Sequence, residues 1–558
     1  MKTVFLNQTV IVDIDHKDKF PIESTSFETD RLIIKCLGYF LNLSDCLKRH
    51  SCSNFVDLCL MLYEKHILLP KVLNGAYISI IYDKKSHDLY VFNDLLSKQS
   101  LFYYYDYKSS KLLISDSFFK AFEMVKDNHL SYSIDELGLK MMLSHGIFYD
   151  DLTYINEIKF LRPFEYLVLS IGKLETKIIE RPKIINPSFE EAAEQIHQKF
   201  QEAVELQYKK NEEGGFPQVI ALSGGMDSRS TFLYALAIGY KQQICYNFAE
   251  STSADFDIAR DLAVKNDCEF FYHALDRGNH LMEREEMCES NEAQAVYSGP
   301  SGTYNCLRFF GTERMGIVHT GLGGGEIMGD MRIPDNPTIT EKFVNSLKYR
   351  MGKGKKESSW ESFFNSLNCT ENEISRLHEM RDKYSDFNEF QSLNDIRRCL
   401  NSQKMARSFG IDYVSPFLYE DFFCYMLQIP YSLSKDRKLY LYWQKKYNPE
   451  QFKTPSTFQM GCRPGNKLGY YVKRFYKFIV NKMGGKTRYD MNPEEFWLSN
   501  NPKIVKTQNK LYCSDMDVIR NRVDVSLFNH LERCWSTGMA SRSNILTVTW
   551  ALKKIVEN

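Results

Sequence analysis

A strand-like apolar run that ends in two glycines and an aspartate is the segment of this sequence best suited to chemistry. Residues 219–239 read VIALSGGMDSRSTFLYALAIG, the pattern of a strand, a glycine-rich turn and a helix. Such a corner offers backbone N–H groups and the positive end of a helix dipole, and together these bind phosphate. The pattern therefore predicts a phosphate site at the turn.

Each polar residue of this turn has an expected role. Gly224 and Gly225 let the backbone approach an anion without a Cβ clash, and Ser223 and Ser228 add hydroxyl donors. Asp227 would by itself repel phosphate, so we expect it to bind the Mg²⁺ that neutralises a polyphosphate. The alternative is an ordinary corner in which Asp227 caps the helix. The complete Ser-Gly-Gly-x-Asp-Ser string favours the phosphate site.

The whole chain has the composition of a multidomain globular protein. It has 558 residues and a formal net charge of +0, which gives no general reason to expect nucleic acid as a partner. The N-terminal residues lack the apolar core of a signal peptide, and no run is long enough for a membrane span. The 14 cysteines form no CxxC pairs, which favours free thiols in a reducing cytoplasm.

The pattern of elements divides the chain into two parts. Residues 1–180 are β-rich, with four strands expected in 75–83, 87–94 and 101–117, antiparallel to their neighbours in a meander. Residues 188–558 begin with a long helix whose Ser188 and Glu191 are spaced as a capping box, and then alternate strands and helices. This alternation predicts a doubly wound parallel sheet in an α/β domain, preceded by a smaller α+β domain.

The last two hundred residues are mostly helical in pattern. Within them, residues 465–488 read GNKLGYYVKRFYKFIVNKMGGKTR, a segment that is both basic and aromatic. Two interpretations stay open at this point, a surface that binds a membrane or nucleic acid, or a helix whose charged face is simply solvated; the second is the more common.

Several segments in order along the chain resemble one family, the asparagine synthetases and their relatives. The string LSGGMDSR looks like the pyrophosphate loop of their ATP pyrophosphatase domain, and the β-rich first part looks like their class II, Ntn-type glutaminase domain. The segments that carry the resemblance are LSGGMDSR (222–229), TSADFDIARDLAVKNDCEFFYH (252–273), IVHTGLGGGEIMGD (317–330), MARSFGIDYVSPFLYEDFFCYMLQIP (405–430) and LNGAYISIIYD to SDSFFKAF (73–122).

This resemblance implies an ATP- and Mg²⁺-dependent, AMP-forming ligase. Its members adenylate a carboxylate and let an amine or ammonia displace AMP to form an amide. The second glycine-rich loop, after residue 320, would join the first in holding the nucleotide. The residues expected to bind ATP and its pyrophosphate are Leu222, where adenine would pack, and Ser223, Gly224, Gly225, Asp227, Ser228, Gly321 and Gly323.

The chain departs from the family at its start. The family's glutaminase uses a cysteine at the mature N-terminus, whereas this sequence begins Met-Lys-Thr and has no cysteine before Cys36. We therefore expect no hydrolysis of glutamine and a first domain kept as a scaffold. Relatives of that kind include the β-lactam synthetases and the lasso peptide cyclases, which use an amine already present on their substrate.

Three further departures concern the synthetase part. In the second loop Gly325 stands where the family has its second metal aspartate, and the neighbouring Glu326 either binds the metal instead or caps the following turn. Leu322 replaces a frequent acid or tyrosine. The family's Pro-Phe-Leu-Asp element ends in Tyr419. The late family lysine has no equivalent in register, but Lys453 and Arg463 flank its expected place, and each is also a plausible surface cation.

These observations leave more than one function open. The favoured one is an amide-forming ligase acting on a small-molecule or peptide carboxylate and amine, with protein partners from a biosynthetic gene cluster; an enzyme that amidates a sugar acid with external ammonia is a variant of it. The alternative is a nucleotide-binding pseudoenzyme or scaffold. The tRNA-modifying enzymes share the first loop, but their cysteine pairs and basic domains are not evident here.

Overall fold

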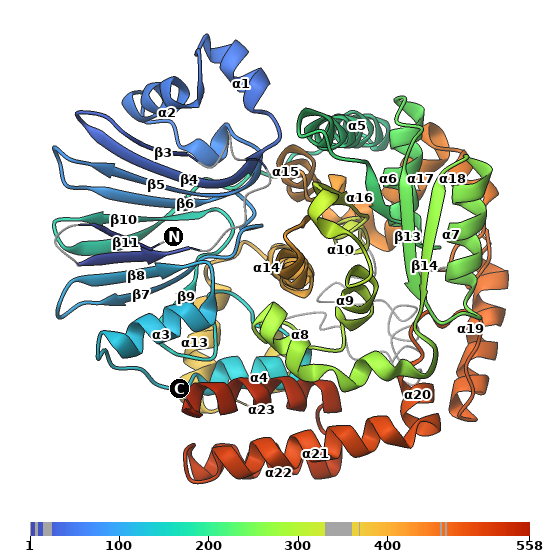
Figure 1. Cartoon of the computed structure of the whole chain (residues 1–558). Coiled ribbons are helices and arrows are strands. Elements are labelled where there is room, and N and C mark those ends of the chain that lie inside the picture. The colour runs from blue at the N-terminus through green and yellow to red at the C-terminus, as the bar shows by residue number, and fades with distance from the viewer. Residues whose placement is uncertain are drawn as a thin grey trace.

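Two stacked sheets and their covering helices form the first part of the chain in the computed structural model (Figure 1). The structure describes residues 2–5, 9–14, 20, 25–329, 360–367, 369–457, 460–463 and 466–557. One sheet has the order β1-β2-β8-β7-β9 and the other the order β11-β10-β6-β5-β4-β3. Their strands are β1 (Lys2–Phe5), β2 (Val10–Asp13), β3 (Thr25–Glu28), β4 (Leu32–Phe40), β5 (Gly75–Asp83), β6 (Leu89–Asn93), β7 (Phe102–Asp106), β8 (Lys111–Ser115), β9 (Ile158–Phe160), β10 (Glu165–Ser170) and β11 (Lys173–Ile178).

Alternating side chains of these strands build separate cores. Val12, Ile80 and Ile114 point between the two sheets, whereas Ile34 and Ile81 point outward onto α1 and α2. The covering helices are α1 (Leu43–His50), α2 (Phe55–Glu64), α3 (Phe118–Asp127) and α4 (Glu136–His145). The first part is therefore layered helix, sheet, sheet, helix.

The expected meander is wrong in one respect. β5 and β6 are antiparallel neighbours, and so are β7 and β8, but the two hairpins belong to different sheets. β6 pairs next with β10, which comes more than seventy residues later in the chain. Local turns predicted each hairpin, but the apolar faces of both had to be buried against each other, and this stacks them instead of joining them edge to edge.

The second part contains the expected parallel sheet, with the order β14-β13-β12-β15-β16 and every neighbouring pair parallel. Ile220 and Cys245 face α6 and α7 on one side, whereas Val219 and Tyr246 face α9 on the other. The elements are α5 (Phe189–Glu213), β12 (Val219–Ala221), α6 (Met226–Ala237), β13 (Ile244–Ala249), α7 (Ala254–Lys265), β14 (Glu269–Ala274), α8 (Arg284–Asn291), α9 (Ser301–Leu307), β15 (Ile317–His319), α10 (Gly324–Ile327) and β16 (Asp412–Val414).

The remaining helices wrap around the sheet and return to the first part. α14 lies between the two halves in Figure 1, and α23 packs on α4 of the first part. These helices are α12 (Trp360–Leu367), α13 (Glu371–Arg381), α14 (Phe387–Gln403), α15 (Glu420–Gln428), α16 (Tyr431–Ser434), α17 (Lys438–Tyr447), α18 (Glu450–Lys453), α19 (Lys467–Lys482), α20 (Glu494–Asn500), α21 (Pro502–Ile519), α22 (Val525–Thr537) and α23 (Arg542–Glu557). Among the residues that the structure describes, no helix has both the length and the apolar character that crossing a bilayer needs.

Candidate functional site

Both glycine-rich loops lie at the same edge of the parallel sheet. The first follows β12 and the second follows β15, and these strands are parallel neighbours. From β12 the chain proceeds to β13 and β14 on one side, whereas β15 and β16 lie on the other. The carboxyl ends of strands at such a reversal of strand order are where open α/β sheets bind ligands.

The first loop is held in shape by its own hydroxyl groups. The backbone N–H of Ser223 donates to Ser228 Oγ at 3.0 Å, and the two serine hydroxyls lie 2.9 Å apart. The N–H of Gly225 donates to Ser223 Oγ at 3.2 Å. Gly225 is the N-cap of α6, and within the described chain no side chain caps this helix. The first turn of α6 thus keeps backbone donors that an anion can accept.

Asp255 fixes the loop from behind. Its carboxylate accepts from the N–H of Gly224 at 2.8 Å and from Asn247 Nδ2 at 2.9 Å, and Asn247 also donates to the carbonyl of Leu222. Thr457 closes over the loop, because its N–H donates to Gly224 O and its hydroxyl to Asp255. Burial raises the pKa of Asp255, and these hydrogen bonds oppose that effect. Asp255 therefore has a structural role, one strand away from the phosphate turn.

The two loops touch, and glycine makes this contact possible. A Cβ on Gly321 would lie 2.1 Å from the backbone nitrogen of Ser228, and one on Gly324 would lie 2.7 Å from Asp227 Cγ. Gly323 has φ +81°, a conformation that favours glycine. The structure thus brings Gly321 and Gly323 of the second loop beside Asp227 and Ser228 of the first.

Asp227 points into the space between the loops. Its side chain is 24% exposed, and its Oδ2 lies 3.7 Å from Arg437 Nη2. Arg437 is itself buried and stacks over Tyr440. Asp227 thus lies in the first turn of α6, and a cation accompanies it.

Arg229 is the site residue that the sequence reasoning missed. It is 0% exposed, and its Nε donates to the carbonyl of Gly225 at 2.9 Å, which places the guanidinium at the N-terminus of α6. Its Nη1 and Nη2 are buried and have no hydrogen-bond partner in the part of the chain that the structure describes. Burial lowers the pKa of Arg229 to about 10. A buried cation with two unpaired amino groups is costly unless an anion joins it.

Glu326 lies in the second loop and pairs with Arg398. Its Oε1 accepts from Arg398 Nη2 of α14 at 3.0 Å. The described residues hold no cluster of three or more histidine, cysteine or acidic side chains that would bind a metal alone. Magnesium bound to a nucleotide needs only one or two carboxylates beside the phosphate oxygens, so Asp227 fits such an ion. Glu326 as placed serves an ion pair with α14 instead.

The two cations expected from the sequence have exposed side chains. The Lys453 side chain is 68% exposed and pairs with Glu450, and Arg463 is exposed. Arg229 and Arg437 occupy the surroundings of the loop instead. Leu222, which was expected to pack against adenine, is buried among α6 and α7. Leu322, which replaces a frequent acid or tyrosine of the family, is partly buried against the core near α5.

The tyrosine that ends the Pro-Phe-Leu-Tyr element binds across the two parts of the chain. The Tyr419 hydroxyl accepts from Asn74 Nδ2 at 2.9 Å, and the adjacent Glu420 pairs with Lys98 at 2.6 Å. Burial raises the pKa of Glu420 to about 6, against the effect of Lys98. This element joins the first part to the synthetase part and has no place in the loop pair.

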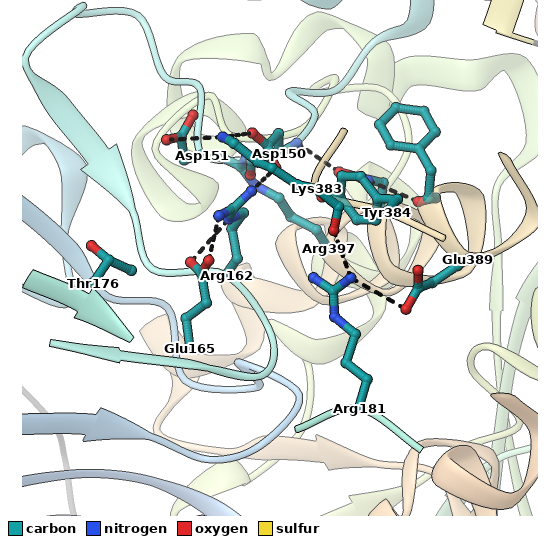
Figure 2. Close-up of polar contacts among 12 residues, drawn as sticks. Asp150, Asp151, Arg162, Glu165, Thr176, Arg181, Lys383, Tyr384, Glu389 and Arg397 are labelled. Carbon is teal, nitrogen blue, oxygen red and sulfur yellow. Dashed lines mark hydrogen bonds and ion pairs between the residues drawn. The ribbon is translucent and has the colours of Figure 1, made fainter. Parts of the chain in front are cut away.

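A second polar cluster lies between the two parts of the chain (Figure 2). Asp150 accepts hydrogen bonds from Arg162, Lys383 and Tyr384, and Arg397 donates to the carbonyls of Asp150 and Leu152. A cavity of about 10 Å³, room for one water molecule, lies among these side chains. The four cations Arg162, Arg181, Lys383 and Arg397 face the four acids Asp150, Asp151, Glu165 and Glu389. Because these charges balance, we interpret the cluster as a joint, that is, a structural contact that holds the two parts of the chain together.

Comparison with known proteins points to the same loops. Residues 195–447 match the family model described as asparagine synthase, a range that contains both glycine-rich loops and Asp255. No curated protein matches the sequence.

Two solved structures align with the chain only weakly. One is the allosteric regulatory enzyme of purine biosynthesis, at 8% identity and a TM-score of 0.19, covering 44% of this chain and 61% of that one. The other is a glutamine phosphoribosylpyrophosphate amidotransferase from B. subtilis, solved with ADP and GMP, at 11% identity and a TM-score of 0.19, covering 66% of this chain and 76% of that one. Similarities at this level support no conclusion about this chain.

Proposed function

Residues 195–447 form a domain that matches the asparagine synthase family model, and from that premise we propose that this chain is an ATP-dependent, AMP-forming amide ligase. In the proposed reaction a substrate carboxylate attacks the α-phosphorus of ATP and pyrophosphate leaves. An amine then attacks the activated carbonyl carbon, loses its proton, and displaces AMP. The net product is an amide.

The first loop carries this proposal. Departure of pyrophosphate builds negative charge, and a catalyst must meet that charge with fixed donors. The N-terminus of α6 supplies backbone donors, and Ser223 and Ser228 supply hydroxyls. Arg229 supplies a positive charge whose two amino groups have no hydrogen-bond partner among the described residues. These groups are already positioned by Asp255 and by the second loop, so little reorganisation is needed on binding.

Asp227 is the proposed ligand of Mg²⁺. A magnesium ion there would neutralise part of the polyphosphate, which is the chemistry that the ion supplies. Arg437, 3.7 Å from the same carboxylate, would hold Asp227 in place before the nucleotide arrives. Glu326 is left out of this assignment because its carboxylate pairs with Arg398.

We also propose that the enzyme takes its amine from the substrate or from free ammonia. The first cysteine of the chain, Cys36, lies in β4, where it is 1% exposed, and Cys46 and Cys59 are buried as well. Burial raises the pKa of both Cys46 and Cys59, which makes these thiols poor nucleophiles. Glutamine added alone should release no ammonia above background, and formation of glutamate would contradict this assignment.

A nucleotide-binding scaffold is the second candidate. The observation that favours it is the ion pair of Glu326 with Arg398, together with the exposure of Lys453 and Arg463. Asp255 is occupied by its hydrogen bonds to the loop, which leaves Asp227 as the carboxylate available to a metal among the described loop residues. Such a protein would bind ATP but form no pyrophosphate with any carboxylate.

Calorimetric titration of ATP, with and without Mg²⁺, tests the proposal without knowledge of the carboxylate. We expect binding that depends on Mg²⁺ in the wild type and is lost in Asp227→Ala. Asp261→Ala is the matched control, because Asp261 is an exposed aspartate of the neighbouring helix α7 that pairs with Arg260. Equal binding by Asp227→Ala would contradict the metal assignment. Pyrophosphate release with a panel of carboxylates and amines then separates the ligase from the scaffold.

A further inference from the structure

Helix α19 presents its apolar face to solvent. Seven large apolar side chains on and directly after this helix are 41% to 82% exposed, and their spacing of three and four residues aligns them along one side. They are Leu468, Tyr471, Val472, Phe475, Tyr476, Ile479 and Met483. A surface helix of a globular protein normally turns such a stripe toward the core, so the orientation of the apolar face of α19 is the reverse of the usual one.

The polar side of α19 is the side that contacts the protein. Lys473 Nζ donates to the carbonyl of Gly461 at 3.3 Å and lies over the Tyr489 ring. Lys477, one turn further along, donates to the carbonyl of Tyr489 and pairs with Asp490. The helix is thus anchored through its lysines, at the edge of the molecule beyond α7 in Figure 1. Because these contacts hold the polar side of the helix against the protein, the apolar stripe faces solvent.

The same segment carries an excess of positive charge. Residues 466–489 contain seven basic residues, Lys467, Lys473, Arg474, Lys477, Lys482, Lys486 and Arg488, and no aspartate or glutamate. Three of the seven pair with acids elsewhere, namely Lys477 with Asp490, Lys486 with Glu250 and Arg488 with Asp257. Lys473 contacts the Gly461 carbonyl, whereas Arg474 and Lys482 have no acidic partner among the described residues and are available to a negatively charged surface.

We propose that α19 docks this protein onto membranes that contain anionic lipids. An outward apolar stripe rich in tyrosine and phenylalanine, together with basic residues and no acids, is the pattern of a helix that lies in the plane of the lipid headgroups. The aromatic rings would enter the boundary between headgroups and acyl chains, and Lys482 and Arg474 would meet the lipid phosphates. A second copy of this chain fits less well, because two such segments would bring like charges together.

Sedimentation with lipid vesicles tests this docking on the full-length protein. Vesicles of phosphatidylcholine alone are compared with vesicles that also contain phosphatidylglycerol, at low and at high salt. We expect binding to the anionic vesicles only, weaker at high salt because the charges are screened. The double variant Phe475→Ser, Ile479→Ser should bind about tenfold more weakly or not at all. Both side chains are exposed, at 63% and 41%, so the fold should not depend on them.

A matched control removes an exposed ring elsewhere. Phe309, 74% exposed after α9, is changed to serine, and this variant should bind vesicles as the wild type does. Absence of binding to anionic vesicles would overturn the proposal. So would equal binding to neutral vesicles, or binding that the double variant retains. A wild-type dimer in solution that Phe475→Ser, Ile479→Ser converts to a monomer, without any vesicle binding, would show that the stripe binds protein instead.

Discussion

Two buried arginines, Arg229 at the first loop and Arg397 between the two parts of the chain, differ in what surrounds them. Burial lowers the pKa of both, to about 10 for Arg229 and about 9 for Arg397. Arg397 donates through Nη1 and Nη2 to two backbone carbonyls and lies over the ring of Phe160. The corresponding two groups of Arg229 have no partner among the described residues.

The comparison distinguishes a structural cluster, whose groups bind one another, from a site whose groups are available to a ligand. Around Arg397 the protein provides two carbonyls and a ring, and of the three guanidinium nitrogens Nε alone has no hydrogen-bond partner among the described residues. Around Arg229 the pattern is reversed, because Nε is bonded and both amino groups lack a hydrogen-bond partner in the same described part of the chain, although the carboxylates of Asp255 and Asp227 act on it electrostatically. Since unpaired buried charge costs free energy, its presence beside a helix N-terminus is best explained by an anion that binds there. The predictions below test this reading, from the largest expected effect to the smallest.

Removal of Arg397 should lower the stability of the protein strongly. Arg397→Met keeps the volume of the side chain but leaves the carbonyls of Asp150 and Leu152 buried without donors. We expect the free energy of unfolding to fall by about 3 kcal/mol. Denaturation by urea measures the change. A variant as stable as the wild type would show that this cluster is not the joint described above.

The same cluster should make stability depend on acid pH. Burial acts to raise the pKa of Asp150, but Arg162 and Lys383 outweigh it and hold the pKa at about 2. Because the pKa is lower in the folded state than in the unfolded state, the carboxylate stabilises the fold above about pH 4 and loses this effect between about pH 4 and pH 2. The loss should be about 2 kcal/mol.

Urea denaturation at a series of pH values, with wild type and Asp150→Asn, isolates this effect. Asp83 also has a pKa of about 2, so the wild type alone does not identify the group. The difference between the two proteins should shrink as the pH falls through this range. A difference that stays constant with pH would mean that Asp150 does not titrate there.

Removal of Arg229 should weaken ATP binding without lowering stability. In Arg229→Met the buried charge disappears, so we expect an unfolding free energy equal to or above that of the wild type. The lost charge-assisted hydrogen bonds to phosphate should weaken ATP binding about tenfold or more. On one preparation, calorimetry measures the affinity for ATP and urea denaturation measures the free energy of unfolding. Arg260→Met on α7 is the surface control. A fall in stability with unchanged affinity would make Arg229 a second structural arginine.

The smallest expected effect is at Glu326. Its ion pair with Arg398 is partly exposed, at 27% and 37%, so a double-mutant cycle of Glu326→Gln and Arg398→Met should give a coupling of about 0.5 kcal/mol. The Mg²⁺ dependence of ATP binding should stay as in the wild type. A loss of that dependence in Glu326→Gln alone would show that the carboxylate leaves Arg398 for the metal.

Local patterns in the sequence predicted the elements well. The capping box of Ser188 and Glu191 marks the start of α5, and the strand, turn and helix around Gly224 and Gly225 appear as expected. Such features depend on contacts a few residues apart, which a sequence displays directly. Arg229 could have been predicted as a site residue as well, because it lies inside LSGGMDSR. The neighbouring sequence, however, does not show that its two amino groups lack hydrogen-bond partners among the described residues.

Contacts between residues far apart in the chain could not be predicted from the sequence. The two hairpins of the first part fall in different sheets because burial of their apolar faces joins segments far apart. Glu326 meets Arg398 because α14 passes beside the second loop. Lys453 and Arg463 were placed by their distance from an expected motif, and spacing along a chain does not fix which way a side chain points.

The sequence by itself determined a parallel α/β domain and predicted a phosphate-binding corner in it, because the glycines, serines and aspartate typical of such a corner are contiguous. It also showed a basic, aromatic segment at 465–488 but left its orientation open. Only the tertiary structure decided that Arg229 is buried with two amino groups that no described residue binds, and that α19 turns its apolar stripe outward. Burial and orientation depend on which distant segments cover a residue, and that is settled only when the whole chain is packed.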